Sequence, residues 1–89
     1  MPVISSFYGI LILMYYFDNR RHHVPHVHVK HGDENVVLSI PEGEVLEGSI
    51  RPNKLKLAQA WIEIHQTELM EDWELAISGR NVFRIEPLR

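Results

Sequence analysis

Apolar and polar residues follow a strand-like pattern in the first half of the chain and a helical pattern in the second. Residues 9–17, G-I-L-I-L-M-Y-Y-F, are rich in β-branched and aromatic side chains and lack helical spacing. They predict a strand buried on both faces in the middle of a sheet. From residue 26 the pattern alternates, as in a half-buried strand. One face of that strand would carry His26, His28 and Lys30, and the other Val27, Val29 and His31.

Two further short strands are expected at residues 35–40 and 44–50. Val36, Leu38 and Ile40 fall on one face of the first of them. Turn-forming residues at 32–34 (G-D-E) and 41–43 (P-E-G) separate successive strands. Connections this short favour an antiparallel meander.

Residues 53–78 change to a helical period, with one apolar stripe. The stripe consists of Leu55, Ala58, Trp61, Ile62, His65, Leu69, Trp73 and Ala76. Pro52 or Asn53 can begin this helix, and Gly79 can end it at the C′ position. Thr67 can instead cap a second helix after a kink near residues 65–68, and the pattern leaves both alternatives open.

These elements predict an α+β fold in which residues 1–89 form a single domain. We expect a three- to four-stranded antiparallel meander, followed by one long helix, kinked or straight, that packs on one face. Residues 80–89 contain a strand-like V-F-R-I that can either join a sheet edge or dock as a tail. The pattern does not determine which face of the sheet the helix covers. That face decides whether His65 lies near His26 and His28.

Composition narrows the class of protein. Hydrophobic residues at 45% and charged residues at 24% are ordinary for a globular domain. A net charge of −3 does not point to nucleic acid or to an anionic membrane. The absence of cysteine excludes disulfides and thiolate zinc sites and fits a reducing compartment. The most hydrophobic segment, residues 3–17, is shorter than the ~20 residues of a membrane span and lacks the features of a signal peptide. We therefore expect a cytoplasmic protein.

Candidate chemistry is concentrated in residues 20–31, R-R-H-H-V-P-H-V-H-V-K-H. This segment holds five of the six histidines and three of the nine Lys and Arg residues, and it has no carboxylate. Imidazole both ligates metals and transfers protons near pH 7. Two functional hypotheses and one structural hypothesis follow from this segment.

The first hypothesis is a metal site. Residues two apart in a strand project the same way, so His26 and His28 can lean toward one ion, with zinc as the example of a divalent transition metal. His22 would supply a third ligand, with His23, Asp33, Glu34 and His65 as alternatives. An open fourth position would make such a site hydrolytic.

The second hypothesis is metal-free cleavage of RNA, in which the 2′-hydroxyl of the substrate is the nucleophile. Catalysis then needs two imidazoles in opposite protonation states and a cation for the phosphate. His26, His28 and Lys30 would meet this need, with His22 in support. Arg20, Arg21 and Lys30 would contact the nucleic-acid backbone. The structural alternative is that the histidines form a polar strand face, or bond to one another and to backbone carbonyls.

Several segments resemble one small bacterial family, catalogued as domain of unknown function 4160. They are the opening P-V-I-S-S-F-Y-G-I-L-I-L-M-Y-Y, then H-H-V-P-H-V-H-V, G-E-V-L-E-G, W-I-E-I-H and W-E-L-A. The most specific block places His22, Pro25, His26 and His28 in a His-x-x-Pro-His-x-His pattern, and Val24 stands where many relatives have a second proline. The resemblance implies a two-gene, toxin–antitoxin-like module with a small cognate protein of the domain of unknown function 2442 type. It implies no catalytic residue.

Two classes of function therefore stay open. One is RNA or phosphodiester cleavage by the histidine cluster. The other is a non-enzymatic interaction module that binds the cognate protein, alone or together at operator DNA. An exposed strand edge would also allow a homodimer.

The helical segment has two further features. The acidic run at residues 68–74 can bind a basic partner segment or form a solvated face. Trp61 and Trp73 are expected in the core.

Overall fold

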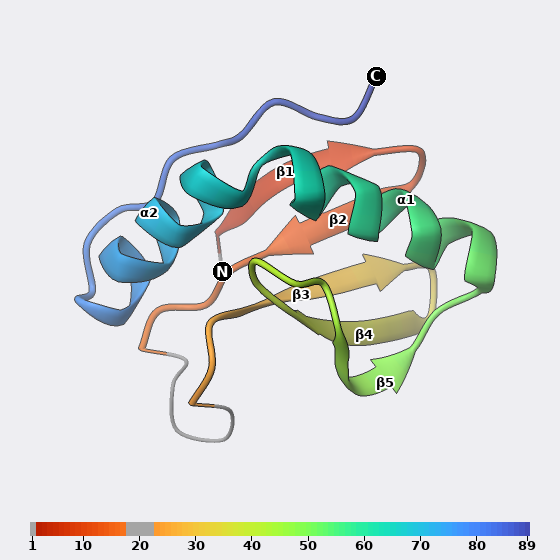
Figure 1. Cartoon of the computed structure of the whole chain (residues 1–89), viewed down its shortest axis with the longest axis horizontal. Helices are drawn as coiled ribbons and strands as arrows, with labels where there is room; N and C mark the ends of the chain where they lie inside the picture. The colour runs from red at the N-terminus through yellow and green to blue at the C-terminus, as the bar shows by residue number, and fades with distance from the viewer. Residues whose placement is uncertain (1, 18–22) are drawn as a thin grey trace.

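The computed structural model describes residues 2–17 and 23–89, which form an antiparallel sheet with two helices on one face (Figure 1). The five strands lie in chain order, so the sheet is a simple meander. The strands are β1 (Val3–Phe7), β2 (Ile10–Leu13), β3 (His26–His31), β4 (Glu34–Ser39) and β5 (Val45–Ser49). The helices are α1 (Pro52–Ile64) and α2 (Gln66–Ile77).

The α+β meander is confirmed, but the expected number of strands was too small. The single strand predicted at residues 9–17 is instead β2, which ends at Leu13 and is preceded by β1. Tyr8 and Gly9 form the two-residue turn between them, with φ of 50° and 78°. Such turns require positive φ at both positions and usually carry Asn-Gly or Asp-Gly. Because the first position is a tyrosine, the sequence did not indicate this hairpin.

The strands β3 and β4 have the predicted core face, but the opposite face is less exposed than alternation implies, because His26, Val37 and Ser39 are also buried. Val36, Leu38 and Ile40 are all buried, as expected from their shared face. In β5, Gly48 has φ +78°, and a Cβ placed there would lie 2.4 Å from the backbone oxygen of Asn35. Only glycine lets β5 approach β4 this closely.

The predicted helical segment forms two helices rather than one. They meet at His65, which is the C-cap of α1 and the N-cap of α2. The second helix was one of the two alternatives, but Thr67 does not cap it. Pro52 does begin α1, and Gly79 ends α2 at the C′ position with φ +74°. A Schellman motif completes this end, because Gly79 N–H donates to Ala76 and Arg80 N–H donates to Leu75, at 3.1 and 2.9 Å.

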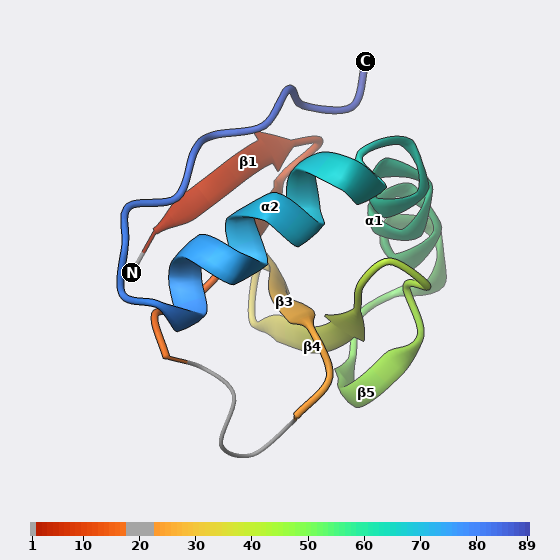
Figure 2. The ribbon, with the colours of Figure 1, turned by 60° about the vertical axis from the view of Figure 1, so that its left-hand side comes forward.

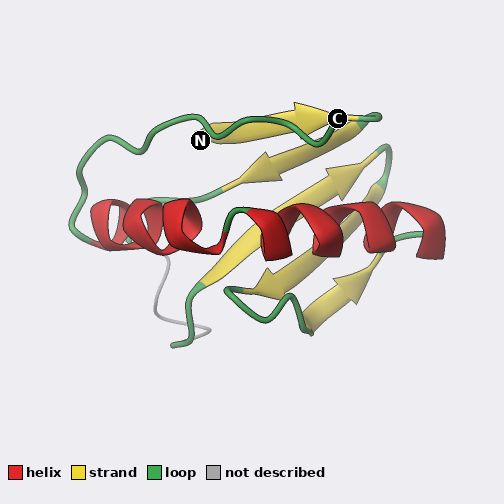
Figure 3. Ribbon diagram, turned by 45° about the horizontal axis from the view of Figure 1, so that its top comes forward, coloured by secondary structure: helices red, strands yellow, loops and turns green. Residues whose placement is uncertain are grey.

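Both helices lie across the same face of the sheet (Figure 3). Their buried residues pack against one side of the strands to form a single core, which includes both tryptophans as expected. The main members are Ile10, Ile12, Val27, Val29, Val36 and Leu38 from the sheet, and Ala58, Trp61, Ile62, Leu69, Trp73 and Ala76 from the helices. The helices therefore cover the Val27 and Val29 side of β3. No helix in the described part of the chain is long and apolar enough to cross a membrane.

The last ten residues dock as a tail and do not form the C-terminal strand that was the other expectation. The tail runs along β1 in both views (Figures 1 and 2). One backbone bond joins them, from Ile85 N–H to the Ile4 oxygen at 2.7 Å. The Trp61 indole also donates to the Glu86 oxygen at 2.8 Å. A buried Ile85 completes the contact, so the tail closes the edge of the core beside β1.

Candidate functional site

Two rows of side chains cross the sheet on the face opposite the helices. The strand register sets both rows, because cross-strand partners project to the same side. The first row consists of Leu13, His28, Val37 and Glu47, and the second of Leu11, Lys30, Asn35 and Ser49. Two histidine-segment residues, His28 and Lys30, thus lie on the sheet face opposite the helices, where they are half-buried beside the buried Leu13 and Val37.

A hollow of about 220 Å³ lies between these rows. Its side chains include an imidazole, an ammonium, a carboxylate, an amide and a phenol. They belong to His28, Lys30, Glu47, Asn35 and Tyr15, with Val37 in the floor. The Tyr15 ring meets the His28 ring edge-on, with ring centres 4.4 Å apart. This contact restrains the half-buried imidazole against the wall of the hollow.

The neighbouring His26 has a different environment. It is 1% exposed, and its ring packs against the Trp73 indole with centres 4.9 Å apart. Its Nδ1 lies 2.8 Å from the carbonyl oxygen of Val24, so this nitrogen is the donor in that contact. The ring centres of His26 and His28 are 5.5 Å apart. His26 is therefore a buried ring packed on Trp73, whereas His28 is half-buried and lines the hollow.

Comparison with protein families identifies the chain. A family model described as Domain of unknown function (DUF4160) matches residues 9–74. The chain belongs to the DUF4160 family. This confirms the resemblance found in the sequence. Comparison with curated proteins and with solved structures gives no match.

The DUF4160 match covers the whole hollow. It begins at Gly9, before β2, and ends within α2, so it includes all of the lining residues from Tyr15 to Gly48. The tail beyond α2 lies outside the matched range. The family description names no activity.

Several predicted site residues cannot be placed. Arg20, Arg21 and His22 lie outside the described residues, so a third metal ligand at His22 and phosphate contacts from the two arginines stay predictions. Among residues 2–17 and 23–89, no three His, Asp or Glu side chains are grouped as they would be to hold a metal ion.

The remaining histidines are dispersed. His23 is exposed. His31 Nδ1 lies 3.8 Å from a carboxylate oxygen of Glu34, at the end of β3 opposite His26. His65 Nδ1 lies 2.6 Å from Glu68 Oε1 on the helical layer, with its ring against Trp61. The structure thus brings His28 and Lys30 to one hollow, with the buried His26 ring beside His28, and leaves His23, His31 and His65 outside it.

Sequence reasoning missed three lining residues, Tyr15, Asn35 and Glu47. The signal for Asn35 was present, because residues that alternate with Val36 and Leu38 must face the other way. A tight turn between β3 and β4 then sets Asn35 opposite Lys30. Glu47 needed the β4–β5 register and Tyr15 needed the end of β2, and neither can be read from alternation alone.

Proposed function

We propose that this DUF4160 protein cleaves RNA without a metal, in the hollow on the uncovered face of its sheet. The observation that supports the proposal is the grouping of His28, Glu47 and Lys30 in one solvent-facing hollow. These three supply a proton donor, a proton acceptor and a cation for the phosphate. The two-gene, toxin–antitoxin-like context implied by the family resemblance is compatible with such an activity.

The spacing across the sheet suits a phosphodiester. His28 and Glu47 are two strands apart in one row, with Val37 between them. Neighbouring strands lie about 4.8 Å apart, so the two Cα atoms are roughly 10 Å apart. An imidazole and a carboxylate at that separation can flank one phosphate group. Lys30, two residues from His28 on the same strand, is placed to offset the phosphate charge.

The reaction that these groups support is transfer of the phosphate to the 2′-oxygen. The Glu47 carboxylate accepts the proton of the 2′-hydroxyl as that oxygen forms a bond to phosphorus. The bond between phosphorus and the 5′-oxygen breaks, and protonated His28 donates to the leaving oxygen. The products are a 2′,3′-cyclic phosphate and a 5′-hydroxyl. Tyr15 holds the imidazole in orientation and offers a ring on which a base can stack.

The test is cleavage of an end-labelled RNA dodecamer by the purified chain in EDTA. We expect a 2′,3′-cyclic phosphate product, and no cleavage of the same strand with 2′-O-methyl groups. His28→Ala and Glu47→Gln should each lower the rate by about 10²–10⁴-fold. Two matched controls, His23→Ala and Glu44→Gln, change exposed residues outside the hollow and should leave the rate unchanged.

Three outcomes would contradict this assignment. Cleavage that all four variants share would indicate a contaminating nuclease. Activity that appears only with added Zn²⁺ or Mn²⁺ would favour the metal hypothesis that includes His22. No cleavage under either condition would favour the non-enzymatic interaction module that binds a cognate protein or operator DNA.

A further inference from the structure

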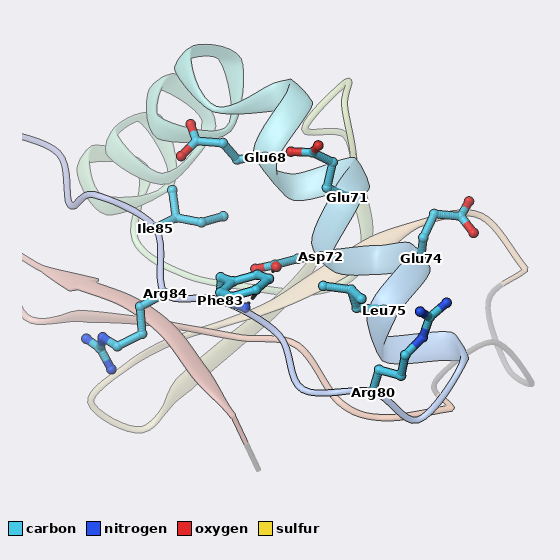
Figure 4. A pocket seen from close by; sticks show the side chains of 9 residues that line it. All are labelled: Glu68, Glu71, Asp72, Glu74, Leu75, Arg80, Phe83, Arg84 and Ile85. Atoms are coloured by element: carbon cyan, nitrogen blue, oxygen red, sulfur yellow. Dashed lines mark hydrogen bonds between the residues drawn. The ribbon is translucent and has the colours of Figure 1, made fainter.

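A second hollow, of about 540 Å³, lies between α2 and the start of the C-terminal tail (Figure 4). We call it the α2–tail cleft. Four carboxylates and Leu75 line it from α2, and two arginines, Arg80 and Arg84, and two apolar side chains line it from the tail. The acidic residues are Glu68, Glu71, Asp72 and Glu74, and the apolar ones are Leu75, Phe83 and Ile85. The cleft shares no lining residue with the hollow in which RNA cleavage is proposed.

Asp72 is the unusual residue of this cleft. It is 2% exposed, and Oδ1 accepts a hydrogen bond from the Phe83 N–H at 2.9 Å. Its other oxygen, Oδ2, is buried with no hydrogen-bond partner in the described part of the chain. A buried acceptor without a donor is costly, and more so when it is ionised. The fold therefore keeps a carboxylate oxygen that lacks a donor.

The surroundings of Asp72 do not supply that donor. Burial raises the pKa of Asp72, the Phe83 N–H opposes this, and the charges of Glu68 and Glu71 raise the pKa further. Arg84 lines the cleft, but its guanidinium donates to the Val3 oxygen at 3.2 Å and points away from Asp72 in Figure 4. Glu71 and Glu74 form no ion pair with any described residue. Arg80 also lines the cleft, at its Leu75 and Glu74 end in Figure 4. Four carboxylates against two arginines leave an excess of negative charge at the cleft, and a further cation would reduce it.

The shape of the cleft favours a peptide over a single ion. Glu68, Asp72 and Leu75 lie at intervals of four and three residues, so they follow one face of α2 over about 10 Å. That length matches about three residues of extended chain. Phe83 is 71% exposed beside these acids, which leaves an uncovered aromatic surface. No three described acidic or histidine side chains are grouped as metal ligands.

We infer that the α2–tail cleft binds a basic and apolar peptide segment of a partner protein, with one Lys or Arg side chain directed at Asp72. The carboxylates of α2 favour basic residues in the bound peptide, and the apolar surface of Phe83 and Ile85 favours apolar residues in it. The ligand cation is directed at Oδ2, the carboxylate oxygen that lacks a donor. The buried oxygen then gains a charge-assisted hydrogen bond that the free protein lacks.

The probe for this inference is a fluorescein-labelled hexapeptide of sequence Leu-Lys-Leu-Arg-Leu-Lys, titrated with the full chain. Amide shifts in a parallel NMR titration should concentrate on residues 68–75 and 80–85. Asp72→Asn keeps the acceptor for Phe83 and removes the charge, so it should weaken binding at least tenfold. Asp33→Asn makes the same change at an exposed turn and should alter the affinity less than twofold. A peptide with Gln in place of Lys and Arg should bind at least tenfold more weakly.

Two results would overturn the inference. One is equal affinity of the wild-type chain and Asp72→Asn for the basic peptide. The other is absence of binding at millimolar concentration. If Asp72→Asn does not fold, Glu71→Gln at the exposed rim replaces it, with an expected two- to fivefold loss of affinity. RNA cleavage is measured separately in the same variants, and it should stay unchanged because the two hollows share no residue.

Discussion

Replacing Gly48 by alanine is expected to destabilise the protein much more than the same change at Gly32. Both glycines have positive φ, +78° and +61°. An L-residue in this conformation costs about 1–2 kcal/mol, and this cost is common to both sites. The surroundings differ. A Cβ at Gly32 meets no atom within 4 Å, whereas a Cβ at Gly48 would lie 2.4 Å from the backbone oxygen of Asn35.

The clash at Gly48 involves backbone, so no side-chain rotation can relieve it. The strands β4 and β5 must separate locally, at a cost typical of overpacking, about 1–3 kcal/mol. We therefore expect a loss of about 2–5 kcal/mol for Gly48→Ala and about 1–2 kcal/mol for Gly32→Ala. A domain of this kind is stable by about 5–15 kcal/mol, so the first variant should lose a large share of its stability.

Urea unfolding followed by tryptophan fluorescence measures both losses, since Trp61 and Trp73 are core residues. Equal losses for the two variants would refute the close approach of β4 and β5. Gly48 also lines the hollow next to Glu47. The Gly48→Ala protein that stays folded should therefore lose RNA cleavage, whereas Gly32→Ala should keep it.

Three further predictions concern packing and pH. His26→Ala should lower the unfolding free energy by about 2–4 kcal/mol, because it empties a buried site, whereas His28→Ala should cost under about 1 kcal/mol; chemical denaturation distinguishes them. Trp61→Phe removes the donor to the Glu86 oxygen and should cost about 1–3 kcal/mol, with faster amide hydrogen exchange in the tail. The pKa of Asp72 is higher in the folded state than in the unfolded state, so the fold is more stable when this carboxyl group is protonated. That stability is fully present below the unfolded pKa, and it is lost as the pH rises through the folded pKa. The Asp72→Asn variant should therefore gain stability relative to wild type between pH 4 and pH 7 in thermal unfolding, and a constant difference would contradict this burial.

The parts of the fold that the sequence predicts are those in which one face is buried. The alternation of apolar and polar residues predicted β3 and β4. A one-residue shift in strand register would move Val27 and Val29 out of the core, so the pattern specifies the register. The apolar stripe gave the helical segment for the same reason, including Trp61 and Trp73. The helix is broken at His65, but the apolar stripe continues across the break. Hydrophobic periodicity alone therefore cannot distinguish two helices from one.

The first hairpin and the tail were harder to predict. Residues of β1 include Ser5 and Ser6, which dilute the apolar pattern. The Tyr8-Gly9 turn also lacks the usual residues of a two-residue hairpin. The tail carries a strand-like pattern but makes a single backbone bond to β1, through Ile85. Such outcomes depend on tertiary contacts rather than on local preference.

The candidate site was predictable only along one strand. His28 and Lys30 share a face by alternation, but nothing local distinguishes a buried His26 from a half-buried His28. Trp73, far along the chain, causes that difference by packing on the His26 ring. Glu47 enters the site through two successive hairpins, so its position depends on the register of both.

The most direct test of the proposed function is an NMR titration of the chain with a 2′-O-methyl RNA tetranucleotide, which can bind but cannot react. Our account predicts that the largest amide shifts fall on Tyr15, His28, Asn35 and Glu47, on the face opposite the helices. It also predicts that Lys30→Gln weakens this binding and lowers its dependence on salt. Shifts confined to α2 and the tail, or no shifts at millimolar RNA, would contradict the placement of an RNA site on the open face of the sheet.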